Sequence, residues 1–99
     1  MLLIRDIMYC KPGKVREMVE KYRGMAKLGE KRGMPKMRVM TDLSAERYWT
    51  IVSEMEVESF EAFMAMGEDP AVRQEMEQVM KGYHDLVDHG RREIYTIEI

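Results

Sequence analysis

The order in which the hydrophobic period changes along the 99-residue chain is the feature that most constrains its fold. Four stretches alternate or run apolar in the manner of strands, at residues 1–10, 36–41, 47–57 and 91–99. Between them, apolar residues recur at three- and four-residue spacing, as on one face of an amphipathic helix. The predicted order is therefore strand, helix, strand, strand, helix, strand.

The helices are predicted from these stripes and from the residues that begin and end them. The first follows Lys11-Pro12-Gly13 and ends at Gly33 and Pro35, and a short helix covers residues 58–66. The last begins at Asp69, a good N-cap before Pro70, and is expected to end at Gly90. The two long stripes are Val15, Met18, Val19, Tyr22, Met25, Ala26 and Gly29, and Val72, Met76, Val79, Met80, Tyr83 and Val87.

This order predicts an α+β fold of the ferredoxin-like βαββαβ type, with a four-stranded antiparallel sheet. Right-handed crossovers place the first and third strands in the centre of the sheet and both helices on one of its faces. Residues 1–99 are long enough for a single domain with a modest core.

The second face of the sheet is expected to need a cover of its own. The first strand places Leu3, Ile7 and Tyr9 on one face while Leu2, Ile4, Met8 and Cys10 occupy the other. The third and last strands are also apolar on both of their faces. The third has Trp49, Ile51, Met55 and Val57 on one and Tyr48 and Val52 on the other, and the last has Ile94 on one and Tyr95, Ile97 and Ile99 on the other. A helix layer covers one face only, so a second copy of the chain is the predicted partner. The alternative is an unusually apolar monomeric sheet.

Composition excludes several function classes. The net charge is −2 and the basic residues are interspersed with acidic ones, which is poor material for nucleic-acid binding. No apolar run approaches the roughly 20 residues of a membrane span. A single cysteine and a chain that begins in a strand pattern favour a cytoplasmic protein.

Four short segments give the chain a family resemblance. It resembles the dimeric α/β-barrel superfamily, which includes antibiotic-biosynthesis monooxygenase domains and NIPSNAP-like proteins, over essentially its whole length. The resemblance implies a dimeric α/β barrel and, for an enzyme, cofactor-independent oxygenation of an easily deprotonated aromatic. The segments are Cys10-Lys11-Pro12-Gly13-Lys14, Glu58-Ser59-Phe60-Glu61-Ala62-Phe63, Asp69-Pro70-Ala71-Val72 and Gly90-Arg91-Arg92-Glu93-Ile94-Tyr95.

Asp6 is the most informative single residue, because a carboxylate in the middle of an apolar strand is costly to bury without a partner. Asp6 is a candidate general base in a pocket between sheet and helices. The alternative is a structural pair with an arginine or a backbone amide, or exposure to water.

The resemblance bears on this residue too. Haem-degrading and cofactor-free oxygenase members of the superfamily commonly have an asparagine where Asp6 stands. The haem-degrading members also have a tryptophan and a histidine at positions that correspond to Met66 and Met76 here. These differences disfavour haem degradation.

His84 is the second catalytic candidate, at the edge of the last helical stripe. A solvated or hydrogen-bonded histidine is the alternative. His89 is expected at the C-terminus of that helix, where the dipole favours a cation.

No metal and no cofactor is predicted. The sequence has no His-x-His or HExxH pattern and only one cysteine, Cys10, whose alternatives are a buried small hydrophobe and a reactive thiol. Met34, Met37 and Met40 have the spacing of a thioether site for copper, but Met37 and Met40 fall on opposite faces of a strand.

Two functions of different classes remain open. The first is a homodimer whose cleft between sheet and helices takes a small apolar or aromatic molecule, with Asp6 as its polar contact. The second is a non-catalytic binding or assembly module whose cleft is filled by Trp49 and methionines. The expected lining residues are Met8, Trp49, Met55, Met66 and Met76.

Overall fold

The computed structural model describes all residues from Met1 to Ile99 and confirms the predicted α+β fold. The strands are β1 (Leu2–Cys10), β2 (Met37–Thr41), β3 (Thr50–Val57) and β4 (Val87–Thr96). They form one antiparallel sheet of order β2-β3-β1-β4, with β1 and β3 in the centre as predicted. The helices are α1 (Val15–Lys31), α2 (Phe60–Ala65) and α3 (Pro70–Val79), with a 3-10 turn η1 at Tyr83–Asp85.

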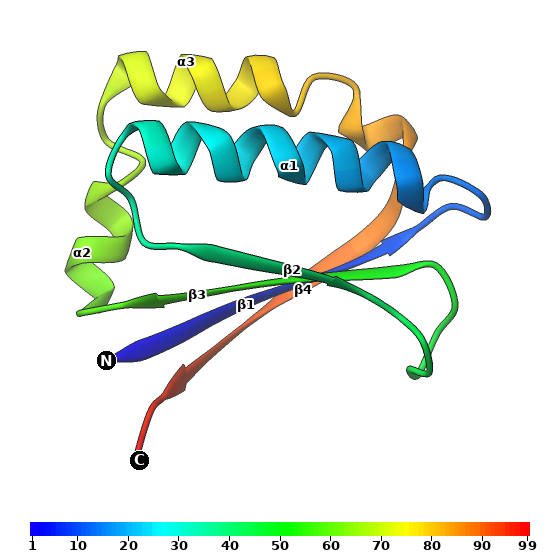
Figure 1. The fold of residues 1–99 in the computed structure, drawn as a ribbon, viewed down its shortest axis with the longest axis horizontal. Coiled ribbons are helices and arrows are strands. Elements are labelled where there is room, and N and C mark those ends of the chain that lie inside the picture. Colours follow the sequence, from blue (N-terminus) through cyan, green and yellow to red (C-terminus); the bar gives the residue numbers. More distant parts are fainter.

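The helices form a layer on one face of the sheet (Figure 1). α1 and α3 run over that face, and α2 stands at one end of the sheet, between the end of β3 and the start of α3. The opposite face carries no helix. None of the helices has the length and apolar character needed to cross a membrane.

The predicted helix starts are confirmed by their capping bonds. The Ala62 amide donates to the Ser59 hydroxyl at 3.1 Å and starts α2. The Ala71 amide donates to the Asp69 carboxylate at 2.9 Å, with Pro70 in the first turn of α3. Gly33, with φ of 70°, follows the end of α1 as expected.

The predicted end of the last helix was wrong. α3 stops at Val79, because the chain turns at Gly82, whose φ of 83° only glycine adopts without strain. Gly90 therefore lies inside β4 opposite Met8, where an added Cβ would come within 2.5 Å of the Met8 sulfur. The apolar spacing continued through this turn, so periodicity alone did not reveal it.

The start of the third strand was also predicted too early. Trp49 has a φ of 63°, which interrupts extended backbone, and β3 begins at Thr50. The turn that precedes it is held by Asp42, whose carboxylate accepts from the Thr50 amide at 2.8 Å. Tyr48 and Trp49 thus belong to the β2–β3 loop and to neither sheet face.

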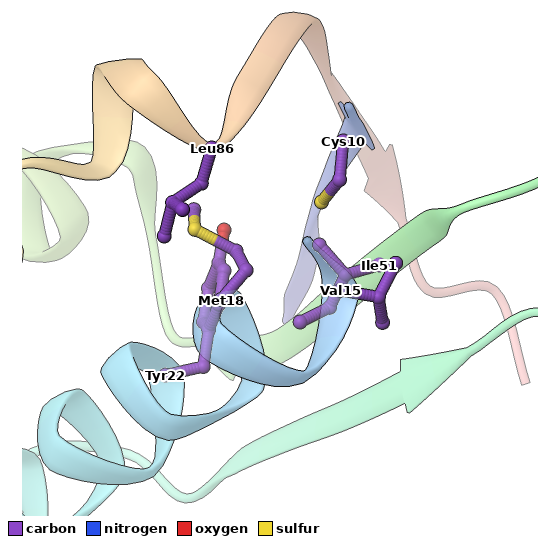
Figure 2. Close-up of a cluster of buried hydrophobic side chains, with 6 residues drawn as sticks. All are labelled: Cys10, Val15, Met18, Tyr22, Ile51 and Leu86. Atoms are coloured by element: carbon purple, nitrogen blue, oxygen red, sulfur yellow. The ribbon is translucent and has the colours of Figure 1, made fainter. Parts of the chain in front are cut away.

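A cluster of six buried hydrophobic side chains packs between the sheet and α1 (Figure 2). Met18 and Ile51 are fully buried there, from α1 and β3. Tyr22 marks the inner limit of this cluster, because it belongs both to the cluster and to the cleft described below. The members are Cys10, Val15, Met18, Tyr22, Ile51 and Leu86.

The face without helices is less apolar than expected. A row of alternating charges crosses all four strands in one register, namely Arg38, Glu54, Arg5 and Glu93. Glu54 accepts from Arg38 at 2.6 Å and from Arg5 at 2.7 Å. We call these four residues the ionic row.

Ile7 and Tyr9, which were expected to require a partner chain, are already buried at 7% and 6% exposure. For Tyr9 the cover includes the Arg47 guanidinium, 4.8 Å from the ring centroid, and the tilted His89 ring at 4.9 Å. The apolar residues of this face that keep some exposure are Leu3, Met40, Val52 and Tyr95.

The ionic row predicts how stability depends on pH. Its hydrogen bonds from Arg38 and Arg5 hold the pKa of Glu54 below its ordinary value of 4.5, although burial acts in the opposite direction. Glu54 thus stabilises the fold above that ordinary value, and this contribution is lost as the pH falls through the lower folded pKa. We expect Glu54→Gln to cost about 1–2 kcal/mol at neutral pH and to flatten the acid limb of a plot of melting temperature against pH.

The matched control is Glu56→Gln, because Glu56 is exposed two residues further along the same face of β3. It should leave the melting temperature at neutral pH unchanged. Equal losses in the two variants would contradict the role of the ionic row.

Candidate functional site

A cleft of about 660 Å³ lies between the sheet and the helices, next to the core cluster. Eighteen residues line it, of which 12 are hydrophobic. Eight of the methionines are among them: Met8, Met25, Met37, Met55, Met64, Met66, Met76 and Met80. Methionine is unbranched and polarisable, so a wall of this kind adapts to the shape of an apolar ligand.

The position of α3 leaves room for the cleft. α3 packs on α1 so closely that a Cβ on Gly24 would lie 2.9 Å from a methyl group of Val79. Val72 is the only residue of α3 that is buried. Met76 of α3 and Met80 directly after it therefore line the cleft without being fully buried.

A row of polar residues crosses the floor of this apolar cleft. Ser53, Asp6 and Arg92 are neighbours on β3, β1 and β4, and Tyr22 of α1 lines the same cleft. We call these four residues the polar row. Arg92 donates from Nε and Nη2 to the two oxygens of Asp6, at 2.6 and 3.1 Å. Its guanidinium also lies 5.0 Å from the ring centroid of Phe63 on α2.

The electrostatics keep the groups of the polar row in defined states. The hydrogen bond to Asp6 raises the pKa of Arg92, so the guanidinium stays charged. Burial, and then the charge of Asp6, raise the pKa of Tyr22 to about 12. Tyr22 is consequently a protonated phenol at neutral pH and can donate a hydrogen bond to a ligand.

Most of the predicted site residues come together here. Met8, Met55, Met66 and Met76 all line the cleft, and so does Asp6. Asp6 forms the pair with an arginine that was one of its predicted structural alternatives, and its role as a general base stays a prediction.

Trp49 is the exception, because the prediction that it lines the cleft was wrong. It lies in the β2–β3 loop, 44% exposed, against a separate depression that includes Gly13 and Val15. The left-handed backbone at Trp49 accounts for this position, because it turns the residue out of the strand to which the sequence pattern assigned it.

The two histidines lie apart from their predicted helix. His84 is exposed in the 3-10 turn, with its ring 4.0 Å from that of Tyr83. It borders a smaller depression of about 380 Å³, which Asp6 and Arg92 also reach. His89 lies on β4, because α3 had already ended at Val79. Its position at a helix C-terminus was therefore wrong.

Sequence reasoning missed Arg92, Ser53, Tyr22 and Phe63 as members of the site. No local signal could have found Arg92 and Ser53, because only the pairing of β1 with β4 and with β3, strands far apart in the sequence, brings them beside Asp6. Tyr22 was assigned to the apolar stripe of the first helix. That it also lines the cleft depends on how α1 lies across the sheet.

Met37 and Met40 lie on opposite faces of β2, as predicted. Met37 lines the cleft, whereas Met40 pairs with Val52 on the opposite face, so the two thioethers do not share a site. No group of three or more His, Cys, Asp or Glu residues is arranged to hold a metal ion.

A four-stranded antiparallel sheet of this order, covered by helices on one face around an apolar cleft, defines a ferredoxin-like α+β protein. No protein-family model and no curated protein matches the sequence. Among solved structures, the chain is similar to an uncharacterized NIPSNAP domain protein from Burkholderia xenovorans, with a TM-score of 0.72 and 17% identity over 98% of this chain and 94% of that one. It is also similar to a "putative antibiotic biosynthesis monooxygenase" from Nitrosomonas europaea, with a TM-score of 0.74 and 14% identity over 100% of both chains.

Protein Atu4242 from Agrobacterium tumefaciens gives a TM-score of 0.79 at 11% identity, over 97% of this chain and 92% of that one. The chain thus has the fold of these NIPSNAP domain and antibiotic-biosynthesis-monooxygenase-like proteins, which is the fold of the single chain that the sequence resemblance implied. At these identities the likeness is one of fold.

The pairing of Asp6 with Arg92 is testable by a double-mutant cycle. The two side chains keep 28% and 52% of their exposure, so solvent weakens the pair, and we expect a coupling free energy of about 1 kcal/mol between Asp6→Asn and Arg92→Gln. Urea unfolding of the two single variants and the double variant measures it.

Arg73→Gln is the control partner for Asp6→Asn, because Arg73 lines the same cleft but donates to the carbonyls of Gly67 and Glu68 instead. Those two substitutions should add without coupling. A coupling of Asp6 with Arg92 that is no larger than with Arg73 would contradict the pair.

Proposed function

We propose that this protein is a homodimer that binds a small apolar or aromatic molecule in the methionine-lined cleft. The cleft itself carries the proposal. Its volume of about 660 Å³ lies within the range of small-molecule sites, roughly 300–1,000 Å³, and four of its polar residues form the polar row on an otherwise largely apolar wall. These properties favour binding over the alternative of a module whose cleft is packed shut.

The helix-free sheet face supports the dimer. Leu3, Met40, Val52 and Tyr95 retain apolar surface there, and the ionic row pairs its charges within the chain. A second sheet can therefore cover the ionic row without leaving any of its four charges buried and unpaired, which would be the costly outcome.

Cofactor-independent oxygenation is the second candidate, favoured by a carboxylate, a phenol and a guanidinium that meet in one apolar cleft. In this reaction Asp6 would take a proton from an anthrone-like aromatic. The carbanion would add oxygen and take back the proton to give a hydroperoxide, which loses water to leave the quinone. Arg92 and Tyr22 would stabilise the negative charge that deprotonation places on the substrate oxygen. Binding remains the first proposal because Arg92 already occupies both oxygens of Asp6.

Two lysine substitutions on β2 test dimer formation and ligand binding independently of each other. Met37 and Met40 both belong to β2 but face the cleft and the helix-free side respectively. Native mass spectrometry of the freshly purified wild type should give twice the chain mass of 11.7 kDa, with an added small molecule. Met37→Lys should lose the added mass and remain a dimer, whereas Met40→Lys should dissociate and keep its cleft intact.

Fluorescence of bound phenylnaphthylamine, a neutral apolar dye, reports on the cleft independently of any retained molecule. Met37→Lys should weaken dye binding at least about tenfold, because it adds a charge to the apolar wall. A wild-type monomer across a dilution series would refute the dimer. Dye binding that is equal in Met37→Lys and wild type would refute the cleft.

Oxygen uptake tests the second candidate. With a panel of hydroquinones and anthrone-like phenols, wild type should consume oxygen and Asp6→Asn should lose at least about 100-fold in rate, the scale of a lost general base. Asp6→Asn keeps the shape of the side chain and should retain dye binding. Uptake that survives the substitution, or no uptake by the wild type, would exclude proton abstraction by Asp6.

A further inference from the structure

A second space, which we call the lobe, adjoins the cleft on the side away from the polar row. It has a volume of about 650 Å³ and lies between the last turns of α1 and the segment of residues 33–36 that leads into β2. No residue of the polar row lines it. The lobe adjoins the cleft, because five methionines line both spaces and stand between them: Met25, Met37, Met55, Met66 and Met76.

Gly29 forms part of the wall of this lobe. Gly29 faces it from α1, and an added Cβ there would meet only the Cβ of Met34, at an ordinary 3.7 Å. Glycine inside a helix costs about 1 kcal/mol relative to alanine. The space that Gly29 leaves open is thus maintained against helix propensity.

The charges that line the two spaces balance. Two carboxylates, Asp6 and Glu68, and two guanidinium groups, Arg73 and Arg92, line the cleft, and Glu30 and Lys36, both exposed, are the charged residues of the lobe. At the polar row Asp6 already pairs with Arg92, so a charged head would find no uncompensated partner there, whereas a neutral oxygen can accept from Tyr22 and from the remaining donors of Arg92.

We propose that the cleft and the lobe together hold one elongated ligand, with an uncharged oxygen-bearing head at the polar row and an unbranched apolar chain that ends beside Gly29. This inference rests on the proposed binding function and specifies the class of ligand. The shared methionines are the passage for the chain, and their flexibility lets a straight chain pass between them.

A series of straight-chain alcohols tests the proposal. n-Butanol, n-hexanol, n-octanol and n-decanol are titrated against the phenylnaphthylamine complex of the full-length protein. Each methylene that enters an apolar site tightens binding by up to about fourfold, so n-decanol should bind at least about tenfold more tightly than n-hexanol. n-Decanoate, with a charged head of similar length, should bind at least about tenfold more weakly than n-decanol.

Gly29→Leu places a side chain in the lobe and should strengthen α1, because leucine is a better helix former. It should abolish the gain from n-hexanol to n-decanol and leave n-butanol binding unchanged. Lys27→Leu is the control, since Lys27 is exposed on the same helix and lines neither space. It should retain the full dependence on chain length.

The outcomes separate the two proposals. If 2-naphthol displaces the dye but the alcohols show no dependence on chain length, the cleft binds ligands and the elongated ligand is refuted. A chain-length dependence that Gly29→Leu leaves unchanged refutes the lobe as the site of the chain. Tighter binding of n-decanoate than of n-decanol refutes the neutral head. If neither naphthol nor any alcohol displaces the dye, the proposed function fails together with this inference.

Discussion

The close contact between α1 and α3 at Gly24 is the constraint on which the rest of the structure depends. It fixes α3 against α1, and α2 holds the other end of α3 beside the end of β3. The helix layer therefore closes tightly on the sheet at the core cluster and loosely beyond Tyr22. A bulkier residue at Gly24 would push the two helices apart and change the width of the cleft without altering any residue that lines it.

The ionic row and the polar row cross the sheet side by side, and along each strand that they share they are one residue apart. Arg38, Glu54, Arg5 and Glu93 cross the helix-free face, and one position along, Ser53, Asp6 and Arg92 cross the cleft floor. The pleat sends adjacent residues to opposite faces, so Arg5 and Asp6 serve different surfaces although they are neighbours in sequence. Charges on the two sides are thereby kept in separate, internally paired sets.

Much of the fold follows from sequence because its signals are local. The Asp69-Pro70 start of α3, the Ser59 cap of α2 and the alternation of β1 each predict what the structure contains. The errors came where one backbone angle overrides a pattern, at Gly82 and at Trp49. Of the site, the methionines were predictable from their stripes, but the partner of Asp6 was not, because Arg92 lies 86 residues away and only the β1–β4 register brings it near.

The chemistry of thioethers gives the methionine-lined cleft one more property. Oxidation by peroxide turns a flexible apolar methionine into a polar, chiral sulfoxide. Met18, the methionine of the core cluster, is fully buried, whereas the cleft methionines border an accessible space. Oxidants would therefore reach the wall of the cleft before the core. A folded protein could in this way lose its affinity for apolar molecules while its overall shape survives, and a sulfoxide reductase could restore it.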